Sequence, residues 1–237
     1  KFKRLAYKKV INHAVKKSQK IITPSNYVKE DIIEKFKVDP AKVMVTYEAA
    51  EEEYFKRTKS KTGKEDFILY VGNAYPHKNL LKLLDAVQNN DFKLVVVCPR
   101  DVFWQRLQEE IRKRKLEDKV EMKGYLPPSE LSQLFARAKA YVFPSLSEGF
   151  GIPGLNALAA GVPLICSDIP VLKEVYQDAA IYFNPSDSQD IANKINQVLK
   201  DPKLEKDLIE KGAKQVEKYS WEQMAKSTLQ VYKDAII

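Results

Sequence analysis

Short apolar runs alternate with longer amphipathic stretches along most of the chain. Runs of strand length occupy 67–72, 93–98, 119–124, 140–144, 162–167 and 179–183, and stretches with helical spacing lie at 78–89, 101–115, 127–138, 152–160, 170–176 and 187–200. Strands that are apolar throughout and alternate with helices are typical of a parallel sheet buried on both faces. The pattern therefore predicts an α/β fold, a parallel sheet with helices on both of its faces.

The pattern also divides the chain. Residues 20–23 and 42–47 read as two further strands, with a helix between them that Ser25 caps and that runs to about residue 36. From 48 to 66 the chain is charged and has no periodicity, which predicts a linker. Two more helices, 203–218 and 221–235, close the sequence, and in the helix at 127–138 Ser129 is the expected cap.

The search for a site narrows to the carboxyl ends of the predicted strands, where parallel sheets bind their ligands. In the segment "SEGFGIPGLNALAAG", Gly149 and Gly151 allow a close approach of the backbone or a positive φ. The helix that follows, from Ile152 or Pro153, offers free N–H groups and the positive end of its dipole to a phosphate. Glu148 could accept hydrogen bonds from sugar hydroxyls, or it could simply favour a helix N-terminus.

A second strand end, "VGNAYPHKNL", places His77 and Lys78 at the predicted start of a helix. A lysine there opposes the helix dipole at a cost of ~0.3–1 kcal/mol, which a bound anion would offset. Alternatively, the lysine extends into solvent, and His77 either donates to a phosphate oxygen or fills the turn. Two helix starts of this kind on one sheet predict a diphosphate held between them.

Charge and cysteine content restrict the class of protein further. The formal charge is +8, but residues 1–20 hold eight of the 40 basic residues and no acid, so the remaining 32 bases balance 32 acids. This basic amphipathic segment is either attracted to an anionic membrane surface or forms the solvated face of a packed helix; nucleic-acid binding is disfavoured because no basic-aromatic platform follows.

Cys98 and Cys166 lie singly in apolar runs, as buried thiols in a reducing compartment do. The sequence shows no run long enough to span a bilayer, no signal peptide, no P-loop, no G-x-G-x-x-G, no D-x-D pair and no metal cluster.

Three stretches together resemble the family-4 retaining glycosyltransferases of the GT-B fold: "VGNAYPHKNL", "KGYLPPSELSQLFARAKAYVFPSLSEGFGIPGLNALAAGVPLICSDIPVLKEV" and "YSWEQMAKSTLQVY". The resemblance implies two Rossmann-like domains and a metal-independent, nucleotide-sugar-binding donor domain. It divides the chain into the end of an acceptor domain (1–47), the linker (48–66), a donor domain (67–220) and a helix that packs back on the acceptor domain (221–237). The resemblance thus implies that most of the N-terminal domain is missing from the sequence.

The resemblance also implies roles for individual residues. Lys78 corresponds to the lysine that contacts the donor diphosphate, and Glu148 to the first glutamate of the E-x7-E motif, which contacts the donor sugar. The donor-binding set is completed by loop and backbone positions: Gly72, Asn73, His77, Tyr125, Leu126, Gly149, Phe150, Gly151, Ile152 and Asn156. Of these, Tyr125 and Leu126 are expected to cradle the base, and the amides around Phe150 to hold the phosphates.

The sequence departs from the family pattern at three places. Asn156 stands where the second glutamate of the motif grips the ribose, and a neutral partner weakens that contact by about tenfold. The arginine before the lysine has no counterpart, since Asn73 and His77 occupy the plausible positions. The loop "VVVCPRD" lacks the glycines often seen after the second strand.

The expected activity is therefore hexosyl transfer with retention, from a UDP- or GDP-linked sugar to a glycan or lipid-linked acceptor, with no cofactor and no metal. The fragment alone is expected to be inactive, and the protein to be cytoplasmic, with peripheral contact at the inner face of the membrane. Two alternatives stay open: a non-catalytic or degenerate nucleotide-sugar-binding module, and a GT-B relative of different chemistry such as an epimerase or a phosphorylase.

Overall fold

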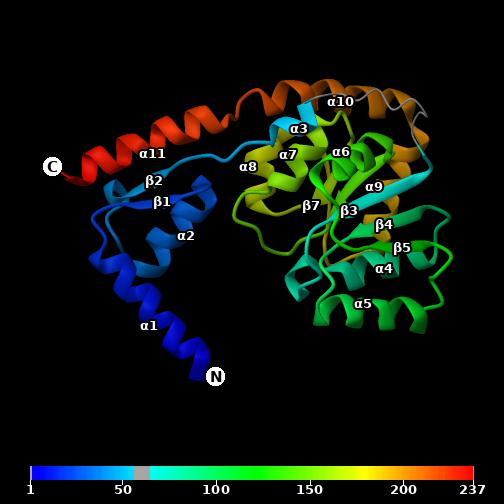
Figure 1. Cartoon of the computed structure of the whole chain (residues 1–237), viewed down its shortest axis with the longest axis horizontal. Coiled ribbons are helices and arrows are strands. Elements are labelled where there is room, and N and C mark those ends of the chain that lie inside the picture. Colours follow the sequence, from blue (N-terminus) through cyan, green and yellow to red (C-terminus); the bar gives the residue numbers. More distant parts are fainter. Residues whose placement is uncertain (1, 56–64, 237) are drawn as a thin grey trace. The chain divides into compact units, whose positions relative to one another are not determined.

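The computed structural model describes residues 2–55 and 65–236, which form two compact units. One unit comprises residues 50–218, and the other comprises residues 1–49 together with 219–237. Figure 1 shows both units coloured along the sequence.

The larger unit is built on a six-stranded, all-parallel sheet in the order β5-β4-β3-β6-β7-β8. The strands are β3 (Phe67–Val71), β4 (Lys93–Val97), β5 (Val120–Lys123), β6 (Ala140–Phe143), β7 (Leu164–Ser167) and β8 (Ala180–Phe183). Chain order runs outward from β3 in one direction and from β6 in the other, so the order reverses between these two neighbours. Ligands of open α/β sheets bind in the crevice at such a switch point, outside the carboxyl ends of the strands.

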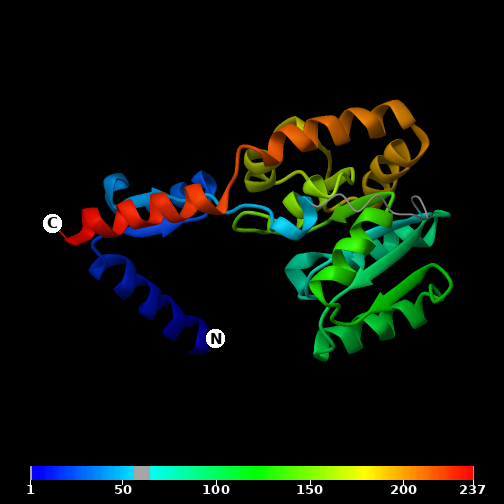
Figure 2. The same cartoon turned by 45° about the horizontal axis from the view of Figure 1, so that its top comes forward.

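Helices cover both faces of this sheet, as the two views in Figures 1 and 2 show. The helices of this unit are α3 (Glu52–Phe55), α4 (Leu80–Gln88), α5 (Val102–Lys113), α6 (Pro128–Arg137), α7 (Ile152–Ala159), α8 (Pro170–Tyr176), α9 (Ser188–Lys200) and α10 (Pro202–Val216). One buried cluster joins α4, α5 and α9 to β3, β4 and β6 through Ile68, Leu94 and Val142. Alternate residues point to the other face, where the Tyr141 ring lies 5.3 Å from that of Phe135 in α6. The expected α/β architecture is confirmed.

In its described residues, the smaller unit contains a two-stranded parallel sheet and three α-helices. Its elements are α1 (Phe2–Lys17), β1 (Ile21–Thr23), α2 (Asn26–Phe36), β2 (Val43–Val45) and α11 (Trp221–Ile236). Ser25 caps α2 as predicted, because its side chain accepts a hydrogen bond from the Val28 amide at 3.2 Å. Tyr47 and Tyr219 make an edge-to-face ring contact at 5.6 Å, which ties the two ends of the chain within this unit.

Two expected helix starts differ from the structure. The helix predicted over 78–89 begins at Leu80, because Pro76–Lys78 forms a separate 3-10 turn and Asn79 takes a left-handed conformation at φ 58°. Ser129 lies inside α6 rather than capping it, since Pro127 is the capping residue and Pro128 fills the first helical position.

The predicted linker, 48–66, is partly structured. Within it, α3 buries Tyr54, whose ring meets that of Phe135 at 5.2 Å. Positions 56–64 lie outside the described residues. Cys98 and Cys166 are buried free thiols, as expected. Within the described ranges, no helix combines the length and the apolar character that crossing a bilayer requires.

Candidate active site

The two loops singled out from the sequence meet at the switch point of the sheet. One loop follows β3 and carries His77 and Lys78, and the other follows β6 and carries Glu148. The Leu146 amide donates a hydrogen bond of 2.7 Å to the His77 carbonyl, so the backbones of the two loops are tied directly. The neighbouring strands β3 and β6 therefore deliver both loops to one place.

Lys78 and Glu148 form an ion pair at this place. The Lys78 Nζ atom lies 2.6 Å from Glu148 Oε1, and each side chain is only 13% exposed. The ammonium group also lies 5.6 Å from the centre of the Phe143 ring, within the range of a cation–π contact. Removing either member of a largely buried pair leaves the other charge without a partner, so the pair is sensitive to substitution.

The start of α7 lies on the same loop as Glu148. Gly151 is the capping residue and has φ +119°, a conformation that favours glycine. The Gly151 carbonyl accepts the Gly154 amide at 3.0 Å and the Leu155 amide at 3.4 Å. Pro153 has no N–H, and the Ile152 amide has no hydrogen-bond partner in the described part of the chain. A donor at the positive end of the helix dipole is suited to an anion.

Three buried tyrosines, which the sequence did not single out, hold the backbone of these loops. The Tyr70 hydroxyl donates to the Asn73 carbonyl at 2.7 Å, the Tyr141 hydroxyl to the Val71 carbonyl at 3.1 Å, and the Tyr176 hydroxyl to the Gly151 carbonyl. Burial raises the pKa of all three phenols well above the usual value, and the nearby Glu148 carboxylate adds to this rise. Each hydroxyl therefore stays protonated and remains a donor.

The remaining predicted residues of the β3 loop shape the turn. Gly72 has φ +152°, and a Cβ there would come within 2.9 Å of the Tyr70 hydroxyl oxygen. The Asn73 side chain accepts the Tyr75 amide at 3.2 Å and so closes the turn itself. His77 is exposed, with its ring 6.1 Å from that of Tyr75.

Tyr125 and Leu126 lie at a different part of the same sheet edge. They line a surface depression of about 620 Å³ at the ends of β4 and β5, with Pro99, Arg100, Met122, Lys123 and Gly124. Tyr125 is 81% exposed, and Leu126 is half-buried. Since β5 is two strands from β3, the depression lies about 10 Å across the sheet from the β3 loop.

Asn156 has a structural contact that the sequence did not reveal. It lies in α7, is 6% exposed, and its Oδ1 atom accepts the Glu51 amide at 3.0 Å. This bond ties α7 to the segment that precedes α3, within the larger unit. The oxygen expected to meet a ribose hydroxyl is thus already bonded to the backbone in this structure.

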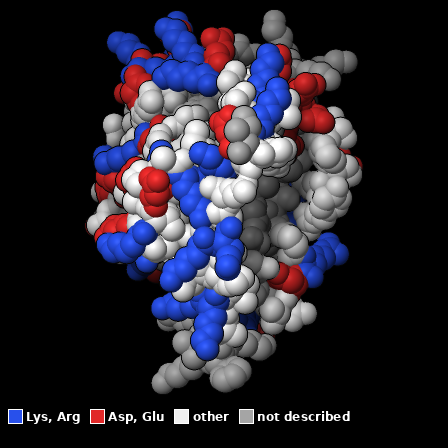
Figure 3. Space-filling view, turned by 90° about the vertical axis from the view of Figure 1, so that its left-hand side faces the viewer, with Lys and Arg blue, Asp and Glu red and all other residues white. Residues whose placement is uncertain are grey.

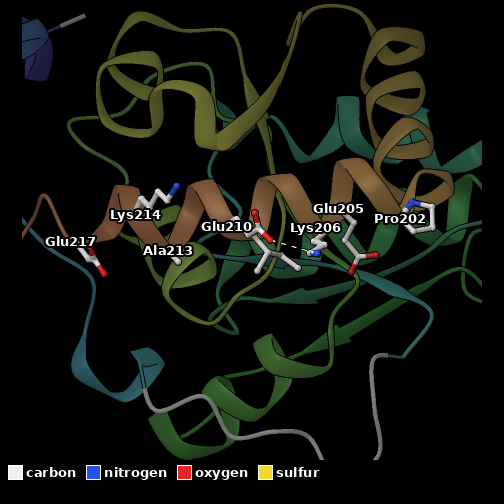
Figure 4. Close-up of a pocket in the computed structure, with 8 residues that line it drawn as sticks. Pro202, Glu205, Lys206, Glu210, Ala213, Lys214 and Glu217 are labelled. Atoms are coloured by element: carbon white, nitrogen blue, oxygen red, sulfur yellow. Dashed lines mark ion pairs between the residues drawn. The ribbon is translucent and has the colours of Figure 1, made fainter.

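Two further observations delimit the site. A depression of about 690 Å³ runs along α10, where Lys206 and Glu210 lie 3.8 Å apart, but it shares no residue with the paired loops (Figure 4). Within residues 2–55 and 65–236, no group of three or more His, Cys, Asp or Glu side chains could hold a metal ion.

The chain belongs to the family of group 1 glycosyl transferases, which matches residues 51–215. It is 33% identical over 217 residues to the O-antigen chain mannosyltransferase RfbU of Salmonella typhimurium, covering 91% of this chain and 60% of that protein. It is 30% identical over 244 residues to the O-antigen chain mannosyltransferase B of Escherichia coli, covering 95% of this chain and 63% of that protein. The chain therefore spans about 60% of the length of these relatives.

A solved structure shows the same fold. The Anabaena protein HepE, crystallised with UDP and glucose, superposes with a TM-score of 0.74 at 16% identity, over 91% of this chain and 62% of that one. The six-stranded parallel sheet flanked by helices thus matches the GT-B glycosyltransferases in architecture.

Proposed function

We propose that this chain supplies the nucleotide-sugar donor site of a family-4 retaining glycosyltransferase that transfers a hexose to a glycan or lipid-linked acceptor. The proposal depends above all on one observation: the Lys78–Glu148 pair lies at the switch point, on the loop that leads into α7. A cation, a carboxylate and an unpaired helix amide are the groups that a diphosphate and a sugar require. Mannose is the hexose named in both curated relatives, and we propose it for this chain.

In the proposed complex the donor diphosphate lies between the Lys78 ammonium and the amides at the start of α7. Charge grows on the leaving oxygen as the bond to the anomeric carbon lengthens, and these groups stabilise that charge. Glu148 orients the sugar and stabilises positive charge on it, while the acceptor hydroxyl attacks from the face that the diphosphate leaves and passes its proton to the departing diphosphate oxygen. A single carboxylate does not define a double displacement, so Glu148 is not assigned as a nucleophile.

The depression beside Tyr125 and Leu126 is the proposed place of the base. Its separation from the β3 loop, about two strand spacings, is of the order of the distance from a nucleoside base to its diphosphate. In this arrangement the nucleotide lies along the carboxyl edge of the sheet, with its base at β4 and β5 and its diphosphate at β3 and β6. UDP and GDP are the nucleotides to be tested.

The experiment that tests this proposal measures transfer by the full-length enzyme. Lys78→Ala and Glu148→Ala are each expected to lower turnover by more than about tenfold, the size of effect typical of lost transition-state stabilisation. The control is Lys226→Ala, which removes an exposed lysine paired with Glu222 in the smaller unit. Wild-type rates for both site variants would rule out the proposed roles.

A second candidate, a non-catalytic nucleotide-sugar-binding module, is favoured by one observation. Asn156 is neutral where the family motif has a carboxylate, and its oxygen is occupied by the Glu51 amide. A full-length protein that binds a nucleotide sugar, but neither transfers nor hydrolyses it, would establish this candidate instead.

We further propose that the smaller unit belongs to the acceptor-binding part of a cytoplasmic enzyme and approaches a membrane surface. In α1, Lys8, Lys9, Lys16 and Lys17 are exposed, and Tyr7 and Val10 are 67% and 65% exposed. Figure 3 shows lysine and arginine side chains gathered on the lower part of the face it presents. Such a helix is attracted to anionic lipid. Sedimentation of the chain with phosphatidylglycerol vesicles, and separately with neutral vesicles, tests this contact. Equal binding to the two kinds of vesicle would contradict it.

A further inference from the structure

Tyr176 joins the loop between Glu148 and α7 to α8, a helix that carries none of the other residues assigned to the site. It is the last residue of α8, its side chain is fully buried, and its hydroxyl donates to the carbonyl of Gly151. Gly151 is 25 residues away in sequence and caps α7. The bond therefore crosses from one strand-helix unit of the sheet to the next.

The surroundings of Tyr176 are shaped to admit this hydroxyl. A Cβ atom built at Gly151 or at Gly154 would overlap the Tyr176 hydroxyl oxygen, and at Gly154 it would also overlap the ring. Two glycines, one at the cap and one in the first turn of α7, thus leave the space that the phenol fills. A close fit of this kind, together with a buried hydrogen bond, allows one position of the Gly151 carbonyl.

The direction of that carbonyl determines the direction of the next amide. In a planar trans peptide, the C=O of Gly151 and the N–H of Ile152 point in opposite directions. The carbonyl points into the protein, where Tyr176, Gly154 and Leu155 donate to it. The Ile152 N–H must then point away from the body of α7, out of its amino end.

We propose that Tyr176 is a positioning residue of the donor site, which fixes the Ile152 amide in the direction needed to bind a diphosphate. The inference rests on the donor-site proposal above. It extends the set of functional residues to a buried side chain that need not touch the ligand. Tyr176 acts through the Gly151–Ile152 peptide, so removing its hydroxyl alters affinity for phosphate more than it alters the fold.

The test uses the whole 237-residue chain, with GDP and UDP as separate probes in titration calorimetry. Tyr176→Phe keeps the ring and removes only the hydroxyl. The matched control is Tyr182→Phe, whose hydroxyl also donates to backbone carbonyls, that of Gln177 at 2.7 Å and that of Leu172 at 3.4 Å, neither of which belongs to α7. We expect Tyr176→Phe to weaken binding of the nucleotide that the wild type prefers by about three- to tenfold, the effect of one hydrogen bond. Tyr182→Phe is expected to leave affinity unchanged.

Amide hydrogen exchange provides the second readout. In Tyr176→Phe, exchange over residues 150–155 should be about tenfold faster without nucleotide, while the strands of the sheet keep wild-type protection. The control variant should exchange like the wild type over this segment. Equal nucleotide affinity in Tyr176→Phe and the wild type, or equal exchange over residues 150–155, would overturn the role proposed for Tyr176.

The outcomes separate the two proposals. If the wild type binds neither GDP nor UDP, the donor-site proposal fails, and the role of Tyr176 fails with it. If the wild type binds a nucleotide and Tyr176→Phe binds it equally well, only the role of Tyr176 fails. If both tyrosine variants lose affinity in proportion to a fall in melting temperature, the effect is one of stability and the positioning role is rejected.

Discussion

Neutralising the two members of the Lys78–Glu148 ion pair is expected to have opposite effects on the affinity for a nucleoside diphosphate. In the ligand-free chain, Glu148 occupies the ammonium group that we assign to the diphosphate, at 2.6 Å. A diphosphate must therefore share Lys78 with a carboxylate of its own sign. Neutralising Glu148 should raise the affinity for a nucleoside diphosphate, whereas neutralising Lys78 should lower it.

The size of the effect follows from the geometry. A phosphate oxygen bound to Lys78 would lie on the order of 5 Å from the Glu148 carboxylate, and two like charges at this distance repel by roughly 3 kcal/mol at an effective dielectric constant of about 20. After screening, we expect Glu148→Gln to bind GDP or UDP about tenfold more tightly. Lys78→Met loses charge-assisted hydrogen bonds worth about 1.5–3 kcal/mol, and should bind about ten- to a hundredfold more weakly.

The assay is titration calorimetry with GDP and UDP at low and at physiological salt. The control variants are Glu65→Gln and Arg137→Met, which break a 2.6 Å ion pair of the same unit before the amino end of β3. These two should leave nucleotide affinity unchanged. If the Lys78–Glu148 pair only stabilised the structure, removing either member would lower nucleotide affinity. Weaker binding by Glu148→Gln would therefore refute the reasoning.

Three further predictions concern the surroundings of the site. Asn156→Glu should tighten nucleotide binding in calorimetry, because a carboxylate can accept a ribose hydroxyl as well as the backbone amide; weaker binding would count against the alignment of the motif. Gly154→Ala should lower the free energy of unfolding by about 1–3 kcal/mol in urea, because its Cβ would overlap Tyr176, and a neutral effect would show that this contact is loose. Burial raises the pKa of Cys98 to about 12, so the folded thiol binds a proton that the unfolded thiol releases near pH 9. Stability should therefore fall between pH 9 and 12, and Cys98→Ala should flatten this part of the profile; an unchanged profile would contradict the assignment.

Much of the fold could be predicted because the pattern of apolar and polar residues that specifies strands and helices is local in the sequence. Apolar runs of strand length that alternate with amphipathic stretches are produced by burial on both faces of a parallel sheet, and all six strands of the larger unit lie where these runs do. The rule that ligands lie at carboxyl strand ends selected the loops of Lys78 and Glu148, which the structure brings together. Strand order could not be predicted in this way, since it depends on pairings distant in sequence.

The features that the sequence did not predict have two physical origins, a local turn and contacts between residues distant in sequence. Asn79 was expected inside a helix, but the proline two residues before Lys78 starts a 3-10 turn that a left-handed Asn79 ends. Two further contacts join residues distant in sequence: Tyr176 with Gly151, 25 residues apart, and Asn156 with Glu51, 105 residues apart. No local sequence pattern predicts them. Tyr70 and Tyr141 lie within apolar strands and were indistinguishable from other core residues, although their hydroxyls hold the loops that follow.

Every role proposed for this site depends on a diphosphate that binds between the Lys78 ammonium and the amides at the start of α7. Two-dimensional amide NMR of the 237-residue chain, titrated with GDP and with UDP, tests it most directly. The largest shifts should fall on residues 149–152 and 77–78, and they should shrink in Lys78→Met. Saturable shifts that leave these residues unmoved, and fall instead along α10, would contradict it.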